Sequence, residues 1–182
     1  FAYRTQRVQE DLKRIAMYSD QPKQRVLVSG STGLIGMQLC AFLQAAGHQI
    51  TRLVRPETTL PPDARNDACV KWNDQTGEVL EGSLEGFDTV IHLAGAGIGD
   101  KRWNAKRKAL LKSSRIVPTE HLVRLFGTLD EPPKTFMSGS AVGFYGDRKE
   151  EPLTEDSSSG VGFLSEMAQA WEAAAAPAQK LG

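Results

Sequence analysis

Three glycines stand three residues apart where a strand-forming stretch gives way to a helix-forming one. They lie in RVLVSGSTGLIG, residues 25–36. In such a turn the first glycine permits a sharp bend, the second lets backbone approach a pyrophosphate, and the third lets the helix pack closely on the strand. The amides and positive dipole at the helix N-terminus would then hold the anion. The pattern predicts a dinucleotide site, and a glycine turn without a ligand is the alternative. The expected contacts are Gly30, Ser31, Thr32, Gly33, Leu34, Ile35 and Gly36.

The strand after this turn indicates which dinucleotide to expect. It reads ITRLVR, residues 50–55, and lacks the acidic residue that would bind a ribose 2′-hydroxyl. It carries Arg52 and Arg55 instead, and an arginine can pair bidentately with a 2′-phosphate. We therefore predict NADP as the cofactor, with Arg55 as its contact. The alternative is that either arginine is simply solvated, and it is stronger for Arg52, inside the strand, than for Arg55, at its end.

A scaffold of alternating strands and helices is needed to bring such residues to one edge. A strand, a helix and a strand follow one another within about 30 residues from position 25, which indicates parallel strands joined by a right-handed crossover. The whole pattern predicts an α/β fold, a Rossmann-like doubly wound parallel sheet. The expected strands are residues 25–29, 49–54, 70–72, 89–93 and 134–137.

Apolar spacing predicts the helices of this fold. Helices are expected at residues 4–18, at 34–46, at 104–129 with an interruption near Pro118, and at a final segment capped by residues 157–159. The packing face of the helix at 34–46 is expected to carry Ile35, Leu39, Phe42, Leu43 and Ala46.

The amino-acid composition argues against several kinds of partner and location. The 182 residues carry 22 basic and 22 acidic side chains, so no overall charge favours nucleic acid or an anionic membrane as a partner. No apolar run approaches the roughly 20 residues that cross a bilayer, and the polar start is unlike a signal peptide. Cys40 and Cys69 form no CxxC pair, which favours a reduced, cytoplasmic setting and no metal site.

Further stretches carry a family resemblance. They are VLVSGSTGLIG, DTVIHLAGAGIGDKRWNAKRKALLKSSR, SGSAVGFYGD and FLSEMAQAWE, and together they span residues 25–172. The chain resembles the extended and atypical short-chain dehydrogenase/reductases, and within them the sugar-epimerase family, in its cell-division-inhibitor-like branch. The resemblance implies a Rossmann fold, NADP(H) binding and a nominal nucleoside-diphosphate-sugar substrate.

The resemblance also implies roles for particular residues. The cofactor-lining loop would be Leu93, Ala94, Gly95 and Ala96. Ser140 matches the serine that hydrogen-bonds the reacting oxygen of the substrate, and Tyr145 follows it, with loop packing as the equal alternative. Arg102 and Trp103 would meet a substrate phosphate, although a solvated helix face explains most of the seven basic residues at 101–115. For His92, inside an apolar strand, a core role is preferred over that of a base.

One family feature is missing. Members usually carry Tyr-x-x-x-Lys early in the last helix, where tyrosine moves a proton and lysine lowers its pKa. Here Phe163 or Leu164 stands at the tyrosine position, with Met167 or Ala168 at the lysine position. Glu166 is the titratable group nearby and a candidate surrogate.

Domain boundaries and function follow as expectations. Residues 1–24 are expected to be a helix and linker ending an upstream domain, and residues 25–182 an NADP-binding Rossmann domain that is incomplete at its C-terminus. The leading hypothesis is an NADP-dependent epimerase or related oxidoreductase acting on a small molecule, with Ser140, Tyr145 and Glu166 as catalytic candidates. The alternatives are a non-catalytic NADP(H)-binding or sensing module and a scaffold that binds no nucleotide.

Overall fold

A six-stranded sheet forms the centre of the molecule, in the strand order β4-β3-β2-β1-β5-β6. The computed structural model describes residues 2–181. Every neighbouring pair of strands is parallel except β3 and β4, which are antiparallel. The predicted doubly wound parallel sheet is therefore confirmed. The strands are β1 (Arg25–Ser29), β2 (Gln49–Val54), β3 (Ala68–Trp72), β4 (Val79–Glu81), β5 (Thr89–His92) and β6 (Thr135–Ser138).

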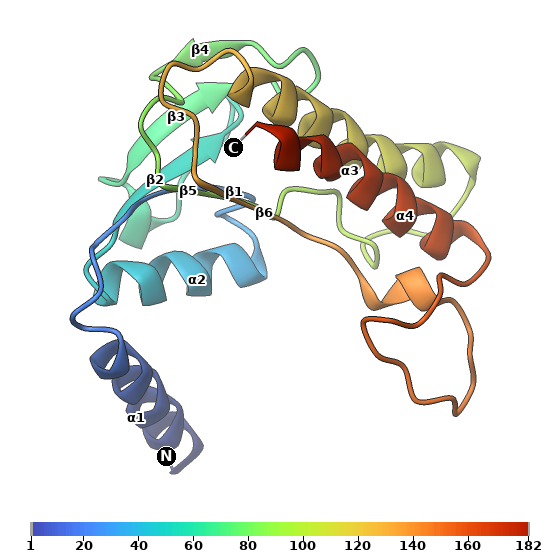
Figure 1. Cartoon of the computed structure of the whole chain (residues 1–182), viewed down its shortest axis with the longest axis horizontal. Helices are drawn as coiled ribbons and strands as arrows, with labels where there is room; N and C mark the ends of the chain where they lie inside the picture. Colours follow the sequence, from blue (N-terminus) through green and yellow to red (C-terminus); the bar gives the residue numbers. More distant parts are fainter. Residues whose placement is uncertain (1, 182) are drawn as a thin grey trace.

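Helices cover both faces of this sheet. Helix α2 (Leu34–Ala45) lies on one face, while α3 (Ala105–Phe126) and α4 (Phe163–Ala175) lie side by side on the other (Figure 1). Helix α1 (Ala2–Met17) projects away from the sheet at the N-terminal end. Short 3-10 helices are η1 (Pro62–Ala64), η2 (Val142–Tyr145) and η3 (Ala176–Lys180). No helix within residues 2–181 is long and apolar enough to span a membrane.

Alternating side chains of the strands fill two separate cores. In β1, Val26 and Val28 pack on the α2 side, whereas Leu27 packs on the α3 side. Both sets are buried, which explains the continuous apolar runs of these parallel strands. The chain winds outward from β1 through β2 and β3 to the edge strand β4, and then crosses to β5 on the other side of β1. The strand order thus reverses beside β1, and ligands of open α/β sheets bind at the carboxyl ends of the strands at such a point.

The predicted interruption of the long helix at Pro118 is wrong, because α3 continues through it. Pro118 removes one backbone donor but is fully buried, so the packing of this face offsets the loss. The neighbouring Thr119 hydroxyl donates to the Arg115 carbonyl at 2.6 Å and accepts from Trp171 Nε1 at 3.1 Å. This contact ties α3 to α4 at the proline.

Two other helix predictions are corrected. Ile35 is 68% exposed and does not belong to the packing face of α2, whose buried residues are Gly36 and Cys40. Helix α4 begins after Gly162 and is not capped by residues 157–159. The Ser157 hydroxyl instead accepts the Thr154 amide at 3.0 Å and closes a turn within the preceding loop.

Candidate functional site

The glycine turn lies between β1 and α2, against the end of β5. Gly30 has φ +67°, and a Cβ there would lie 2.6 Å from the Leu93 carbonyl carbon. A Cβ on Gly36 would collide with the carbonyl oxygen of Gly30, so this glycine lets α2 start directly against the turn. A Cβ on Gly33 would have only that same oxygen nearby, at 3.2 Å. The first and third glycines therefore serve close packing, while the second keeps an open side free of atoms.

The first turn of α2 leaves its amides available to a ligand. Gly33 is the N-cap residue, makes no side-chain cap, and its carbonyl accepts the amide of Met37 at 2.9 Å. The preceding amides, of residues 34–36, have no acceptor within the helix. No acidic side chain occupies this first turn. The Ser31 hydroxyl is buried and has no hydrogen-bond partner within the described residues. These groups fit a bound anion such as a diphosphate.

A cleft of about 740 Å³ opens beside this turn, at the carboxyl ends of β1, β2, β3 and β5. Most of the residues expected from the sequence to contact the cofactor line this cleft. Residues 34–36 do not line it, and the side chains of Leu34 and Ile35 are exposed. The cleft is lined by Ser29–Gly33, Leu53–Thr58, Trp72–Gln75 and Leu93–Ala96, together with Leu110 and Ser114 of α3.

The two arginines of β2 have different surroundings. Arg55 follows the last residue of β2, lines the cleft, and has a side chain that is 59% exposed. Its Nε lies 3.3 Å from Glu57 Oε1, so a bound phosphate would compete with this carboxylate. Arg52 is only 4% exposed, so the alternative that this arginine is simply solvated is wrong. It is held by Asp67 at 2.7 Å and by the carbonyl oxygen of Ser31 at 2.7 Å.

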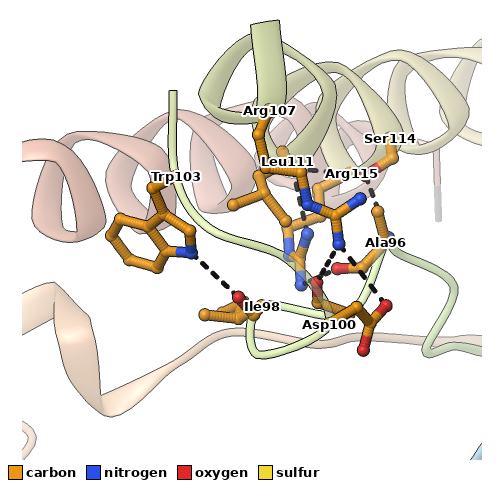
Figure 2. A network of polar contacts seen from close by, with 9 residues as sticks. Ala96, Ile98, Asp100, Trp103, Arg107, Leu111, Ser114 and Arg115 are labelled. Carbon is orange, nitrogen blue, oxygen red and sulfur yellow. Dashed lines mark hydrogen bonds and ion pairs between the residues drawn. The ribbon is translucent and has the colours of Figure 1, made fainter. Parts of the chain in front are cut away.

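The loop after β5 is fastened to α3 by side chains that Figure 2 shows converging on it. Both backbone polar groups of Ala96 are used: its amide donates to Ser114 Oγ at 3.0 Å and its carbonyl accepts from Arg115 Nη2 at 3.1 Å. Arg107 Nη2 donates to the Gly97 carbonyl and, at 3.4 Å, to Asp100 Oδ2. Because Ala96 lines the cleft, these contacts fix one of its walls.

The basic run at 101–115 is therefore more than a solvated helix face. Arg115 is 8% exposed, and burial, followed by the charge of Arg107, lowers its pKa. Arg102 is exposed. The indole of Trp103 donates from Nε1 to the Ile98 carbonyl at 2.9 Å and packs edge-on against Phe163 at 5.6 Å. Trp103 thus joins the loop to the start of α4.

His92 lies in the core, as the sequence favours, beneath the cleft. It is fully buried, with Nδ1 at 2.5 Å from Ser29 Oγ and with Nε2 lacking a partner among the described residues. Burial lowers the pKa of His92 to about 4. The ring is therefore neutral at physiological pH, and it does not line the cleft.

The catalytic candidates lie in three different segments. Ser140, after β6, donates its hydroxyl hydrogen to Glu172 of α4 and lines a second cavity, of about 570 Å³, bounded by β6, α4 and η3. Tyr145 ends η2 and is half-buried, with its ring edge-on to Phe144 at 5.3 Å. Glu166 lies in the first turn of α4 and is exposed. The structure brings Ser140 to a carboxylate, but that carboxylate is Glu172, which sequence reasoning missed.

The positions expected for tyrosine and lysine hold apolar side chains in α4. Phe163 packs against Trp103, while Met167 and Ala168 are buried. None of these groups can transfer a proton. Among residues 2–181 no three His, Cys, Asp or Glu side chains are placed to hold a metal ion.

Sequence reasoning also missed part of the cleft wall after β3. Asn73, Asp74 and Gln75 line the cleft, and the Gln75 carbonyl contacts His121 Nε2 of α3 at 2.9 Å. A signal for them exists, since they follow a parallel strand at the edge that carries the glycine turn.

A family model and several relatives from one family match this chain. The family model described as the NAD dependent epimerase/dehydratase family matches residues 26–162. An epimerase family protein of Mycobacterium leprae is 37% identical over 157 residues, which are 86% of this chain and 48% of that protein. The chain spans about half the length of the relatives it matches.

Solved structures share the fold. A nucleoside-diphosphate sugar epimerase from Corynebacterium glutamicum matches all of this chain and 37% of its own, with 38% identity and a TM-score of 0.79. Human epimerase family protein SDR39U1, solved with NADPH, matches 83% of this chain and 48% of its own, with 30% identity and a TM-score of 0.70. Together with the sequence motifs and the cleft, these matches show that the chain belongs to the NAD-dependent epimerase/dehydratase family.

Proposed function

We propose that the chain binds NADP(H) in the cleft and forms the cofactor-binding half of an epimerase or related oxidoreductase of the short-chain dehydrogenase/reductase type. The observation that carries this proposal is the position of Arg55, which lines the same cleft as a glycine turn with free helix-start amides. NADP(H) carries a diphosphate and a separate 2′-phosphate. The helix-start amides suit the diphosphate, and the Arg55 guanidinium suits the 2′-phosphate.

Each wall of the cleft has a part in this proposal. The turn, Gly30–Gly36, binds the diphosphate through backbone amides, and Arg55 pairs with the 2′-phosphate in place of its contact with Glu57. The backbone of Leu93–Ala96 lies along the adenosine side. The NADPH in the structure of the human relative supports NADP over NAD.

The proposed reaction uses residues beyond the cleft. NADP(H), when bound, supplies hydride transfer to or from the substrate. Ser140 is the candidate that donates a hydrogen bond to the reacting oxygen, which requires its hydroxyl to turn away from the Glu172 carboxylate that it contacts in this structure. Glu172, Tyr145 and Glu166 are the candidates that would exchange the substrate's proton. Arg102 and Trp103 would contact the substrate. The description of the Corynebacterium relative supports a nucleoside-diphosphate sugar as that substrate.

A second candidate function is cofactor binding without turnover. Phe163, Leu164, Met167 and Ala168 stand where the family's proton-transferring pair is expected, and this favours a module that senses NADP(H) or is stabilised by it. Incubation with NADPH or NADP⁺ and a panel of nucleotide sugars separates the two functions. Turnover that is lost in Ser140→Ala supports the enzyme, whereas tight binding with no turnover supports the sensor.

The cofactor assignment is tested by equilibrium titration with NADPH and NADH. We expect NADPH to bind more tightly, and Arg55→Ala to remove about 1–3 kcal/mol of that preference, the contribution of a hydrogen bond to a charged group. Arg65→Ala removes an exposed arginine of the neighbouring loop that does not line the cleft, and it should keep the preference. An Arg55→Ala protein that discriminates as well as the parent would refute the assignment.

A further inference from the structure

Arg52 places a guanidinium group beneath the glycine turn. Its position in β2 puts its side chain on the face covered by α2, the face on which its neighbour Ile50 packs with Cys40. The side chain is 5% exposed. A buried guanidinium is costly unless its donors are used and its charge is compensated. Arg52 therefore has specific partners.

Those partners come from separate segments of the chain. Arg52 Nε donates to Asp67 Oδ2 at 2.7 Å, and Nη1 donates to the Ser31 carbonyl oxygen at 2.7 Å. Asp67 also accepts from Gln44 Nε2 of α2 at 3.1 Å through its other oxygen. One ion pair thus joins β2, the glycine turn, the segment before β3, and α2.

The contact with Ser31 sets the orientation of one peptide group in the turn. In a trans peptide the C=O and the following N–H point in opposite directions. Because the Ser31 carbonyl points at Arg52, the Thr32 amide points away from the buried arginine, on the side where Thr32 is exposed and lines the cleft. The Gly30 carbonyl is likewise engaged, since it accepts the Gly33 amide at 3.0 Å.

We infer that Arg52, held by Asp67, is a positioning residue for the diphosphate-binding turn: it keeps the Ser31 carbonyl away from the anion and turns the Thr32 amide toward it. This inference rests on the proposed function. The carboxylate of Asp67 compensates the charge of Arg52, so the pair acts through backbone orientation rather than through net attraction. A carbonyl oxygen rotated into the cleft would repel a phosphate and remove one donor.

The test compares a ligand that carries the diphosphate with one that lacks it. NADPH spans the turn and the Arg55 region, whereas adenosine 2′-monophosphate carries only the 2′-phosphate. In Arg52→Met we expect the Kd of NADPH to rise about tenfold or more, as for loss of a hydrogen bond to a charged group. The Kd of adenosine 2′-monophosphate should change by less than about twofold. Arg52→Lys keeps the positive charge and a group that can donate a hydrogen bond, so it should recover part of the NADPH affinity.

Other outcomes separate the possible failures. Equal weakening of the binding of both ligands would show that Arg52 only stabilises the fold. Unchanged NADPH binding would show that Arg52 is dispensable. Either result overturns the inference. If the parent chain binds no dinucleotide, the proposed function fails and the inference falls with it. Should Arg52→Met not fold, Asp67→Asn gives the second test, because it loosens the arginine while keeping an acceptor, and it too must weaken NADPH selectively. Arg65→Ala should leave both ligands unchanged.

Discussion

The two sides of the sheet's carboxyl edge differ in how their polar groups are held. On the cofactor side, buried or half-buried side chains fix the backbone of the cleft: Arg52 holds Ser31, and Arg115 and Ser114 hold Ala96. On the side proposed to bind the substrate, Ser140 and Glu166 are exposed, and Ser140 lines a different cavity from the cleft. The described chain thus contains an organised cleft at the glycine turn, whereas the candidates for proton transfer are spread over three segments.

The difference reflects what each task requires. Binding a diphosphate uses backbone amides, which one strand–turn–helix unit can supply and buried contacts can fix. Proton transfer needs side chains within hydrogen-bond reach of one reacting atom.

The largest effect is expected from Gly33→Val. The glycine has an open side toward the cleft, so a branched side chain would occupy the space of the diphosphate while meeting only the Gly30 carbonyl. We expect NADPH affinity to fall at least about 100-fold, or roughly 2.7 kcal/mol, with a circular dichroism spectrum like that of the parent. A variant that binds NADPH normally would refute the role of the turn.

The next effect is a loss of stability at mildly acidic pH. The pKa of His92 is about 4 in the folded chain, below its ordinary value near 6.5, because the ring is buried. The unfolded chain therefore binds the proton first, and the stability present above pH 6.5 is lost as the pH falls toward 4. We expect unfolding by denaturant to show about 2 kcal/mol less stability at pH 5 than at pH 7.

His92→Asn is the control for this pH dependence, since it removes the titrating ring but keeps a polar group near Ser29. The slope of stability against pH between 7 and 5 should flatten in this variant. An unchanged slope would assign the effect to other groups.

A smaller effect is expected at the acidic neighbour of Arg55. In the proposed site, Glu57 would compete with the 2′-phosphate for the Arg55 guanidinium. Both side chains are exposed, so their contact is worth at most about 1 kcal/mol. Glu57→Gln should therefore tighten NADPH binding a few-fold and leave NADH binding nearly unchanged. Titration with both cofactors measures this, and an equal gain for NADH would argue against the 2′-phosphate site.

The smallest effect is expected on the substrate side. Tyr145→Phe and Glu166→Gln alter groups that do not line the cleft, so the Kd of NADPH should stay within about twofold of the parent. A large loss of cofactor affinity in either variant would mean that the two sides are not separate.

Elements of the fold that depend on the local sequence pattern could be predicted. The bounds of β1 follow from the apolar run of residues 26–28, and those of β2 from Ile50, Leu53 and Val54 in the strand-forming stretch that follows the next helix. Strand β4 was missed because it has three residues and exists only as the antiparallel partner of β3. Helix α3 passes through Pro118 because tertiary packing there outweighs the local preference of proline.

The candidate site also has parts that the sequence predicts and parts that only the fold reveals. The glycine turn could be predicted because its residues are adjacent in sequence. The contact of Arg52 with Ser31 and Asp67, and that of Ser140 with Glu172, could not, since they join residues 15 to 32 positions apart that only the fold brings together. The alternation of side chains along β2 places Arg52 on the same face as Ile50, but nothing in the sequence shows that Asp67 and Ser31 lie there to compensate a buried charge.

Hydrogen–deuterium exchange of the chain with and without saturating NADPH tests the central claim most directly. We predict that the largest protection will fall on peptides covering residues 30–36, with further protection at residues 53–58. A saturated complex in which the amides of residues 30–36 exchange as fast as in the free chain would contradict the account.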